Sequence, residues 1–215
     1  MYIDLENITP QRDPSNTASA FAKWVYDIHH PRERTDSEYE NNKEEKRKER
    51  GILSHRRINL FFDLRSTKKY LDNADRSQWD LDYRDESPES PILKCSSLKI
   101  GDKPMRCKPD VVLKHKNTGS ILIIEHKTTY ISIDRLPEDG WPNVQAQLWC
   151  YSWIDEWLSV SDVQLVGWLW HRKDGALISN SEHSFSWNRS DKEHNEYCND
   201  LFKVYGGEFT NPLDQ

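Results

Sequence analysis

The sequence has no apolar run that approaches the roughly 20 residues needed for a membrane-spanning helix. Its first residues, from Met1 to Glu6, are acidic and lack the basic start and apolar centre of a signal peptide. The sequence therefore lacks the usual signs of a membrane protein or a secreted protein. We therefore expect a soluble, intracellular protein that is located in the cytoplasm and has no membrane partner.

Cysteine is scarce, and its spacing argues against the common sites that are built from it. The four cysteines lie far apart, and no two of them form a C-x-x-C pair: Cys95, Cys107, Cys150 and Cys198. Such spacing does not indicate a structural zinc site or an iron–sulfur cluster. A chain of 215 residues is long enough to bury a core without disulfides. We expect no iron–sulfur cluster.

The chain has no overall excess of positive charge, since its formal net charge is -6. This balance argues against wholesale coating of nucleic acid, but the charge is unevenly distributed. Residues 43–69 hold ten Lys and Arg against four Asp and Glu, whereas residues 174–215 hold three against eight. Five bases stand against one acid in residues 93–109: Lys94, Lys99, Lys103, Arg106 and Lys108. The pattern fits a polyanion-binding protein, and it fits a mixture of solvated faces equally well.

The pattern of apolar residues predicts one domain over residues 1–215, of the α/β (α+β) class, with a central mixed sheet flanked by helices. The expected helices are 17–29, 51–66, 143–158 and 191–205, and the expected strands are 92–100, 110–113, 120–126 and 163–170. Turns are expected at 116–119 and 173–175. We expect residues 71–91 to form a loop or an irregular hairpin. The charged segment 32–50 is expected to be mobile.

Polar residues that suit a catalytic site stand at the ends of two strand-like runs. Asp110 begins one run, and Glu125 follows the apolar run 121–124. Pairing of these strands would place the two carboxylates side by side, and a divalent cation with oxygen ligands would relieve their repulsion. Alternation along a strand turns Lys127 to the same face as Glu125. Its ammonium could then orient an attacking water and offset charge on a phosphate.

In that arrangement the backbone carbonyl of His126, between Glu125 and Lys127, is a further candidate metal ligand. The alternative is an ordinary hairpin with exposed charges at its ends, because the spacing Asp…Glu-x-Lys is common by itself. The preceding apolar run favours a site, since a carboxylate directly after a buried strand needs a partner.

Two further features extend this candidate site. Gln147 and Tyr151 stand four residues apart on one face of a predicted helix. A glutamine in an apolar stripe needs a hydrogen-bond partner, and the sheet edge that bears Lys127 is the expected place. His55 lies on the apolar face of the predicted helix 51–66. A single histidine there is more often part of a core, but near two carboxylates it can supply a nitrogen to a metal.

These pieces, taken in order, resemble the motifs of RecB-type nucleases of the PD-(D/E)xK superfamily. They are Gly51-x-x-x-His55, Pro109-Asp110, Glu125-His126-Lys127 and Gln147-x-x-x-Tyr151. That branch includes helicase–nuclease subunits, CRISPR-associated adaptation nucleases and stand-alone exonucleases. The resemblance covers residues 51–151, about half of the chain. The iron–sulfur cysteine cluster of some members is absent.

The resemblance implies a restriction-endonuclease-like core and a metal-dependent deoxyribonuclease. It implies that one or two Mg²⁺ or Mn²⁺ ions are held by His55, Asp110, Glu125 and the His126 carbonyl, with Lys127 as the catalytic lysine. It also implies that Gln147 and Tyr151 orient the site and contact DNA. We expect Arg106 and Lys108 to bind the phosphate backbone. An exonuclease is favoured, and a single-stranded substrate is compatible with the sequence.

Three alternatives remain at this point. A non-catalytic nucleic-acid-binding module on the same fold has no need for a lysine beside paired carboxylates, so the intact set argues against it. An RNA endonuclease would leave the same motifs, because recognition of the 2′-hydroxyl has no short signature. Virus-type cap-snatching endonucleases also combine His, Pro-Asp and Glu-x-Lys, but they do not require the Gln-x-x-x-Tyr pair.

Overall fold

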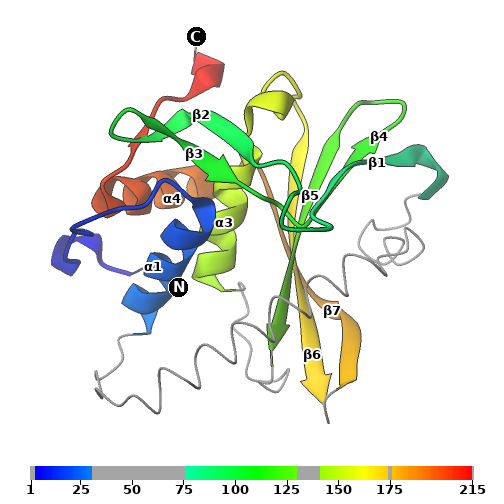
Figure 1. Ribbon diagram of the computed structural model, residues 1–215, viewed down its shortest axis with the longest axis horizontal. Coiled ribbons are helices and arrows are strands. Elements are labelled where there is room, and N and C mark those ends of the chain that lie inside the picture. The colour runs from blue at the N-terminus through cyan, green and yellow to red at the C-terminus, as the bar shows by residue number, and fades with distance from the viewer. Residues whose placement is uncertain (1–2, 31–75, 130–140, 174–175, 215) are drawn as a thin grey trace.

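The computed structural model describes residues 3–30, 76–129, 141–173 and 176–214. Within these ranges two sheets and three α-helices form a layered α+β structure, with the helices and the smaller sheet beside the larger sheet (Figure 1). The charged segment 32–50 and the predicted helix 51–66, which carries His55, lie outside the described residues.

A mixed five-stranded sheet is the centre of the fold, as the sequence predicts. Its strands are β1 (Trp79–Arg84), β4 (Val111–His115), β5 (Ile121–Thr129), β6 (Val163–Lys173) and β7 (Ala176–Asn188). They lie in the order β1-β4-β5-β6-β7. The β5–β6 pair is parallel and the other three pairs are antiparallel. The parallel pair needs a crossover, and the chain between β5 and β6 contains helix α3 (Pro142–Ser152).

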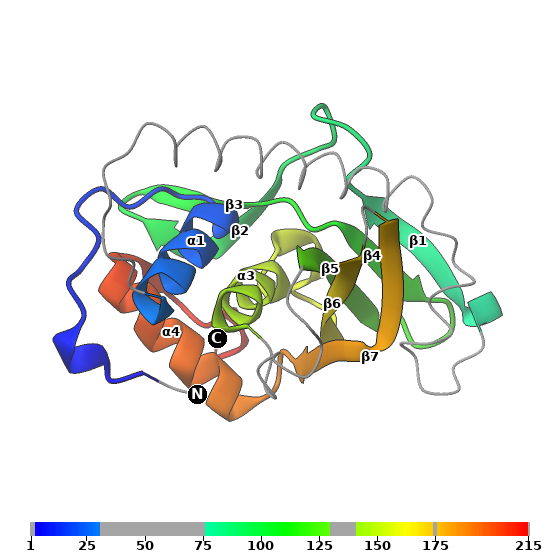
Figure 2. The same cartoon turned by 90° about the horizontal axis from the view of Figure 1, so that it is seen from below.

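The remaining elements cover one face of this sheet. A three-stranded sheet has the order β3-β2-β8, with β2 (Leu93–Ile100), β3 (Lys103–Cys107) and β8 (Glu208–Phe209). Helices α1 (Ala18–His29) and α4 (Lys192–Tyr205) lie beside α3, which separates them from the larger sheet (Figure 2). Short 3₁₀ turns complete the described chain at Leu5–Asn7, Arg76–Gln78, Asp155–Trp157 and Pro212–Asp214.

Alternation along β5 divides its apolar residues between two cores. Ile121 and Ile123 belong to the larger core, which the three helices share, while Leu122 and Ile124 belong to a smaller core on the other face. All four side chains are fully buried, as expected for a central strand. Because side chains at every second residue share a face, Glu125 follows Ile121 and Ile123 on the side of α3.

The ends of two helices are fixed by local chemistry that the sequence carries. The Thr17 hydroxyl accepts a hydrogen bond from the Ala20 N–H and caps α1. The Asp191 carboxylate caps α4 in the same way through the His194 N–H, and Gly206 ends this helix with a left-handed φ of 100°. The predicted helices 17–29 and 191–205 are therefore confirmed to within one residue.

The four cysteines, distant in sequence, meet in the larger core and are free thiols. Burial raises the pKa of the Cys107 thiol well above its usual range, and the neighbouring Cys95 and Cys150 raise it further. The thiols therefore remain protonated and pack as small apolar groups.

Two expectations about secondary structure are wrong in part. Residues 79–84, within the segment 71–91 that was predicted to be a loop or an irregular hairpin, form strand β1 at the edge of the larger sheet. The predicted helix 143–158 is too long, because α3 ends at Ser152 and Ile154 is extended, with φ -61° and ψ 134°. The Arg189 guanidinium donates a hydrogen bond of 3.3 Å to the Ser152 carbonyl. This partner, which is distant in sequence, satisfies a carbonyl at the end of α3 and so favours the early end of the helix.

Strands β3, β7 and β8 were not expected as separate elements. The turn predicted at 173–175 agrees in place with the hairpin of β6 and β7, whose last paired residues are Lys173 and Ala176. In the described parts of the chain, no helix has both the length and the apolar character to cross a membrane.

Candidate active site

Asp110, directly before β4, and Glu125, on the neighbouring strand β5, are both buried carboxylates. Val111 at the start of β4 pairs with Ile124 in β5, so the next residues outward on the two strands are Asp110 and Glu125. Their exposed fractions are 6% and 3%. Oδ2 of Asp110 accepts a hydrogen bond of 2.7 Å from the His126 N–H, which ties the start of β4 to the backbone between Glu125 and Lys127. The predicted juxtaposition is present.

Lys127 lies on the same face of β5 as Glu125. Its Nζ is 2.6 Å from Oε1 of Glu125 and 2.8 Å from the side-chain oxygen of Gln147. The Lys127 side chain is 21% exposed, whereas that of Glu125 is 4% exposed. The ammonium therefore lies at the boundary between a buried carboxylate and solvent, where a substrate group can reach it.

Gln147 has the partner that its place on the apolar stripe requires. Its Oε1 accepts from Lys127, and its Nε2 donates a hydrogen bond of 2.6 Å to the Tyr151 hydroxyl. The Tyr151 hydroxyl in turn donates to the carbonyl of Lys108 at 3.1 Å. Gln147 and Tyr151 are 5% and 1% exposed, so their contacts in this state are with the protein. This burial favours the orienting role that was expected of them over direct contact with DNA.

Burial also fixes the protonation state of Tyr151. It raises the pKa of the phenol well above its usual range, and the negative charge of Glu125 raises it further. The hydroxyl therefore keeps its proton and acts as a hydrogen-bond donor at physiological pH.

The side chain of His126 lies on the face opposite Glu125. It is fully buried, and its Nδ1 accepts a hydrogen bond of 3.0 Å from the Trp170 indole N–H. Its ring also packs against Trp168 at a centroid distance of 5.4 Å. Only the backbone of His126 therefore belongs to the cluster around Glu125. This agrees with the choice of its carbonyl, and not its side chain, as the candidate metal ligand.

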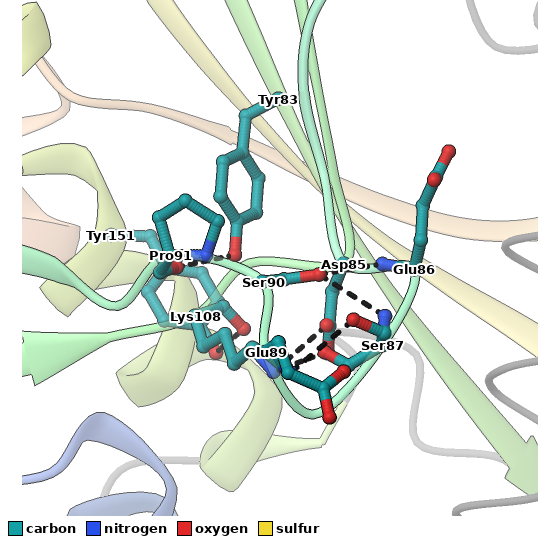
Figure 3. Close-up of polar contacts among 9 residues, drawn as sticks. All are labelled: Tyr83, Asp85, Glu86, Ser87, Glu89, Ser90, Pro91, Lys108 and Tyr151. Carbon is teal, nitrogen blue, oxygen red and sulfur yellow. Dashed lines mark hydrogen bonds and ion pairs between the residues drawn. The ribbon is translucent and has the colours of Figure 1, made fainter.

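Lys108 is held within the protein. Its Nζ lies 2.9 Å from Oδ1 of Asp85 and donates to the Ser87 carbonyl, also at 2.9 Å (Figure 3). In this state its ammonium therefore contacts the loop that follows β1 and is not presented to a substrate. Arg106 is exposed on β3, directly opposite Lys94 on β2. His55, the remaining expected ligand, lies outside the described residues.

Asp85 is a residue of this neighbourhood that the sequence analysis missed. It follows β1, and its N–H donates a hydrogen bond of 3.0 Å to the carbonyl of Asp110. Burial raises the pKa of nearby Tyr83, and the negative charges of Asp85 and Asp110 raise it further. The available signal was the alternation of apolar and polar residues from Trp79 to Arg84, which is typical of a strand.

The donor chemistry of the cluster fits a hard divalent cation. Asp110 and Glu125 offer carboxylate oxygens, which suit Mg²⁺ and Mn²⁺ better than softer metals. Across residues 3–30, 76–129, 141–173 and 176–214 there is no group of three or more His, Cys, Asp or Glu side chains with a metal-binding arrangement. Within these ranges the candidate metal centre thus consists of two carboxylates and the backbone at His126.

A separate hollow of about 720 Å³ lies beside α4 and the C-terminal segment and shares no lining residue with this cluster. Trp153, Arg189, Lys192 and Asn195 are among the residues that line it. Arg189 is 2% exposed, and its Nη1 donates to the Trp157 carbonyl at 3.1 Å. Its guanidinium thus supports the chain that follows α3.

Comparison with known proteins adds little to this geometry. No protein-family model matches the sequence, and no curated protein matches it. Among solved structures, the chain is similar to one described as "Crystal structure of SSO0001", with 17% identity over 93% of this chain and 82% of that chain. The TM-score is 0.35, and a likeness at that level carries no argument about fold or function.

Proposed function

We propose that this protein is a Mg²⁺- or Mn²⁺-dependent nuclease of the PD-(D/E)xK type that hydrolyses phosphodiester bonds in DNA. One observation carries the proposal: the Lys127 ammonium lies 2.6 Å from the buried Glu125 carboxylate, and Asp110 directly precedes the adjacent strand. A purely structural ion pair needs one acid and one base. A second buried carboxylate beside this pair is what a metal-assisted hydrolase requires.

The strand order supports the same proposal. Strands β1, β4 and β5 are consecutive antiparallel neighbours, and β6 follows α3 to lie parallel to β5. This arrangement puts Asp110 at the start of the second strand and the Glu125-x-Lys127 pair on the third. It is compatible with the restriction-endonuclease-like core that the motifs imply.

In the proposed mechanism each residue has a distinct task. Asp110 and Glu125 would hold one or two cations, together with the His126 carbonyl and His55. A bound Mg²⁺ or Mn²⁺ supplies an activated water and stabilises charge on the phosphate. Lys127 would orient the attacking water and offset negative charge on the phosphate. Gln147 holds the Lys127 ammonium in place, and Tyr151 holds Gln147.

The basic ribbon formed by β2 and β3 supports a polyanionic substrate. Lys94 and Arg106 are directly opposite each other and both exposed. Like charges in such a pair are unfavourable in the protein alone, and a phosphate between them would remove the repulsion. The ribbon leads through Lys108 into Asp110. We propose DNA as the substrate, with exonuclease action favoured and single strands suitable.

The test is cleavage of end-labelled single-stranded DNA, double-stranded DNA and RNA with Mg²⁺, Mn²⁺ or EDTA. Wild type is compared with Asp110→Asn and Glu125→Gln, which keep the size of each side chain. We expect metal-dependent cleavage of DNA by wild type alone, with a product ladder that distinguishes an exonuclease from an endonuclease. Cleavage confined to RNA would mean that RNA, and not DNA, is the substrate. Binding without cleavage under all conditions would favour the non-catalytic module.

A further inference from the structure

The hydrogen bonds that lead from Lys127 to Lys108 have a defined direction, because both ends of the chain are chemically fixed. An ammonium only donates hydrogen bonds, so Lys127 requires the oxygen of the Gln147 amide. A backbone carbonyl only accepts, so the Lys108 carbonyl requires a proton from Tyr151. The two ends therefore impose the same orientation on everything between them.

Tyr151 transmits this direction with its single hydroxyl proton. Since the proton is given to the Lys108 carbonyl, the hydroxyl oxygen can accept from Nε2 of Gln147, at 2.6 Å. The opposite face of the amide, Oε1, then points to Lys127 at 2.8 Å. Both side chains are at least nine-tenths buried, so water does not compete for these bonds.

The position of the Lys108 carbonyl therefore decides how Tyr151 and Gln147 are oriented, and a second set of contacts holds this carbonyl in place. Lys108 lies in the short link between β3 of the small sheet and β4 of the large sheet. Its Nζ is clamped by Oδ1 of Asp85 and by the Ser87 carbonyl, each at 2.9 Å, and Figure 3 shows the lysine turned into this loop. The Asp85 N–H also bonds the Asp110 carbonyl at 3.0 Å.

The loop that carries Asp85 is itself tied down. The Tyr83 hydroxyl donates a hydrogen bond of 2.8 Å to the Pro91 carbonyl, so the two ends of the loop are joined. The Ser90 hydroxyl accepts from the Glu86 and Ser87 N–H groups at 3.0 and 3.1 Å. Asp85 thus acts from a braced segment, and its ion pair with Lys108 can restrain the link between the sheets.

We propose that Asp85 is a positioning residue of the active site: its ion pair with Lys108 fixes the carbonyl that receives the Tyr151 proton, and thereby orients Gln147 toward Lys127. The inference rests on the proposed nuclease function, which it deepens by adding a residue that touches neither substrate nor reacting atoms. Without the pair, the Lys108 link shifts and the Tyr151 proton loses its acceptor. The Gln147 amide is then held from the Lys127 side alone, so its Oε1 and the ammonium that it binds lose their fixed position.

The kinetic test replaces Asp85 with asparagine, which keeps the shape of the side chain and removes its charge. We expect kcat to fall by about 10- to 100-fold with KM unchanged, as for displacement of a catalytic group by about 1 Å. The variant Asp85→Glu should recover most of the lost rate. Glu86→Gln is the matched control, because this neighbouring acid pairs with Arg84, whereas Lys108 pairs with Asp85; it should keep the wild-type rate.

Other outcomes of the same experiment overturn the inference. A loss of Mn²⁺ affinity in Asp85→Asn, measured by titration of the metal alone, would make Asp85 a metal ligand. A fall in KM with kcat unchanged would mean that Asp85 only repels the substrate. An unchanged kcat would mean that the ion pair does not position anything.

A second measurement separates this inference from the nuclease proposal. The side-chain amide protons of Gln147, assigned by their loss in Gln147→Met, are followed by NMR and hydrogen exchange in the full chain. We expect them to be protected in wild type and Glu86→Gln, and both shifted and less protected in Asp85→Asn. If they do not respond, the inference fails even for an active nuclease. If the Gln147 amide protons respond but neither the wild type nor any variant cleaves nucleic acid, Asp85 still positions Lys127 and the nuclease proposal fails.

Discussion

The Lys127 ammonium donates a hydrogen bond of 2.8 Å to the side-chain oxygen of Gln147, and this contact joins strand β5 to helix α3 across the larger core. Gln147 is buried, and it shares Lys127 with Glu125, whose Oε1 is 2.6 Å away. A lysine has a long, flexible stem, so two acceptors on different elements are needed to hold its ammonium in one place. The helix thereby sets the position of the group that we propose acts on the phosphate.

Replacement of Gln147 by methionine, which has a similar volume, tests this dependence. We expect cleavage to slow by about 10- to 100-fold, because Lys127 loses one of its two acceptors. The loss of two buried hydrogen bonds should also lower the free energy of unfolding by about 1–2 kcal/mol. Cleavage rates and urea denaturation measure the two effects separately.

Gln145→Met is the control for this change, since it makes the same replacement two residues earlier on α3. The Gln145 amide forms a hydrogen bond of 3.0 Å with Nδ1 of His194, whereas Lys127 bonds Gln147. It should lower stability without a comparable loss of activity. Equal losses of activity in the two variants would mean that Gln147 acts only through stability.

Gly167 on β6 allows α3 to approach the sheet. It pairs with Glu125 on β5, and a Cβ at this position would lie 2.8 Å from Cγ1 of Val144 on α3. The replacement Gly167→Ala should therefore lower the free energy of unfolding by about 1–3 kcal/mol, as overpacking does. It should also lower activity, because Gln147 lies one turn further along the displaced helix.

The double variant Gly167→Ala, Val144→Ala removes the methyl group that the new Cβ would meet. It should be more stable than Gly167→Ala in the same denaturation experiment, although each change alone is destabilising. Simple additivity of the two losses would show that the close approach of Gly167 to Val144 does not limit the position of α3.

The sequence predicts the centre of this site because local patterns decide it. The apolar run 121–124 predicts a buried strand, and the alternation that follows puts Glu125 and Lys127 on one face. Asp110 requires one further step, the pairing of two strands joined by a turn, and the register of Val111 with Ile124 confirms it. The need of a buried amide for a partner predicts the contact of Gln147 with Lys127.

Other features depend on residues that are distant in sequence, and local patterns reveal them incompletely. The alternation in β1 is typical of a strand, but its acids favour a loop. It is an edge strand whose Asp82 accepts a hydrogen bond of 2.8 Å from the Trp157 indole N–H. The early end of α3 is favoured by Arg189, which lies 37 residues after Ser152. The link from Asp85 to Lys108 likewise follows from tertiary structure, since it joins a loop to the connection between two sheets.

His194 gives the protein a stability that depends on pH. It is 1% exposed, and burial lowers its pKa from 6.5 to about 4, although Asp191 opposes this shift. The unfolded chain therefore binds this proton between pH 6.5 and 4 while the folded protein does not, so stability falls as pH is lowered through that range. Each pKa unit corresponds to about 1.4 kcal/mol, which makes the loss about 3 kcal/mol.

Urea denaturation at several pH values, with His194→Gln as the comparison, measures this effect. The difference in unfolding free energy between wild type and variant should change by about 3 kcal/mol from pH 7 to pH 4 and remain constant above pH 7. A difference that does not vary with pH would show that His194 is not buried in its neutral form.

The central claim, that Lys127 acts on the phosphate from beside two buried carboxylates, is tested most directly by Lys127→Met in single-turnover cleavage of end-labelled DNA with Mn²⁺. Lys116→Met is the matched control, because Lys116 is an exposed lysine that pairs with Asp80 at 3.4 Å. We predict that Lys127→Met binds DNA but cleaves it at least about 100-fold more slowly, whereas Lys116→Met cleaves at the wild-type rate. Metal-dependent cleavage by Lys127→Met at the wild-type rate would contradict the account.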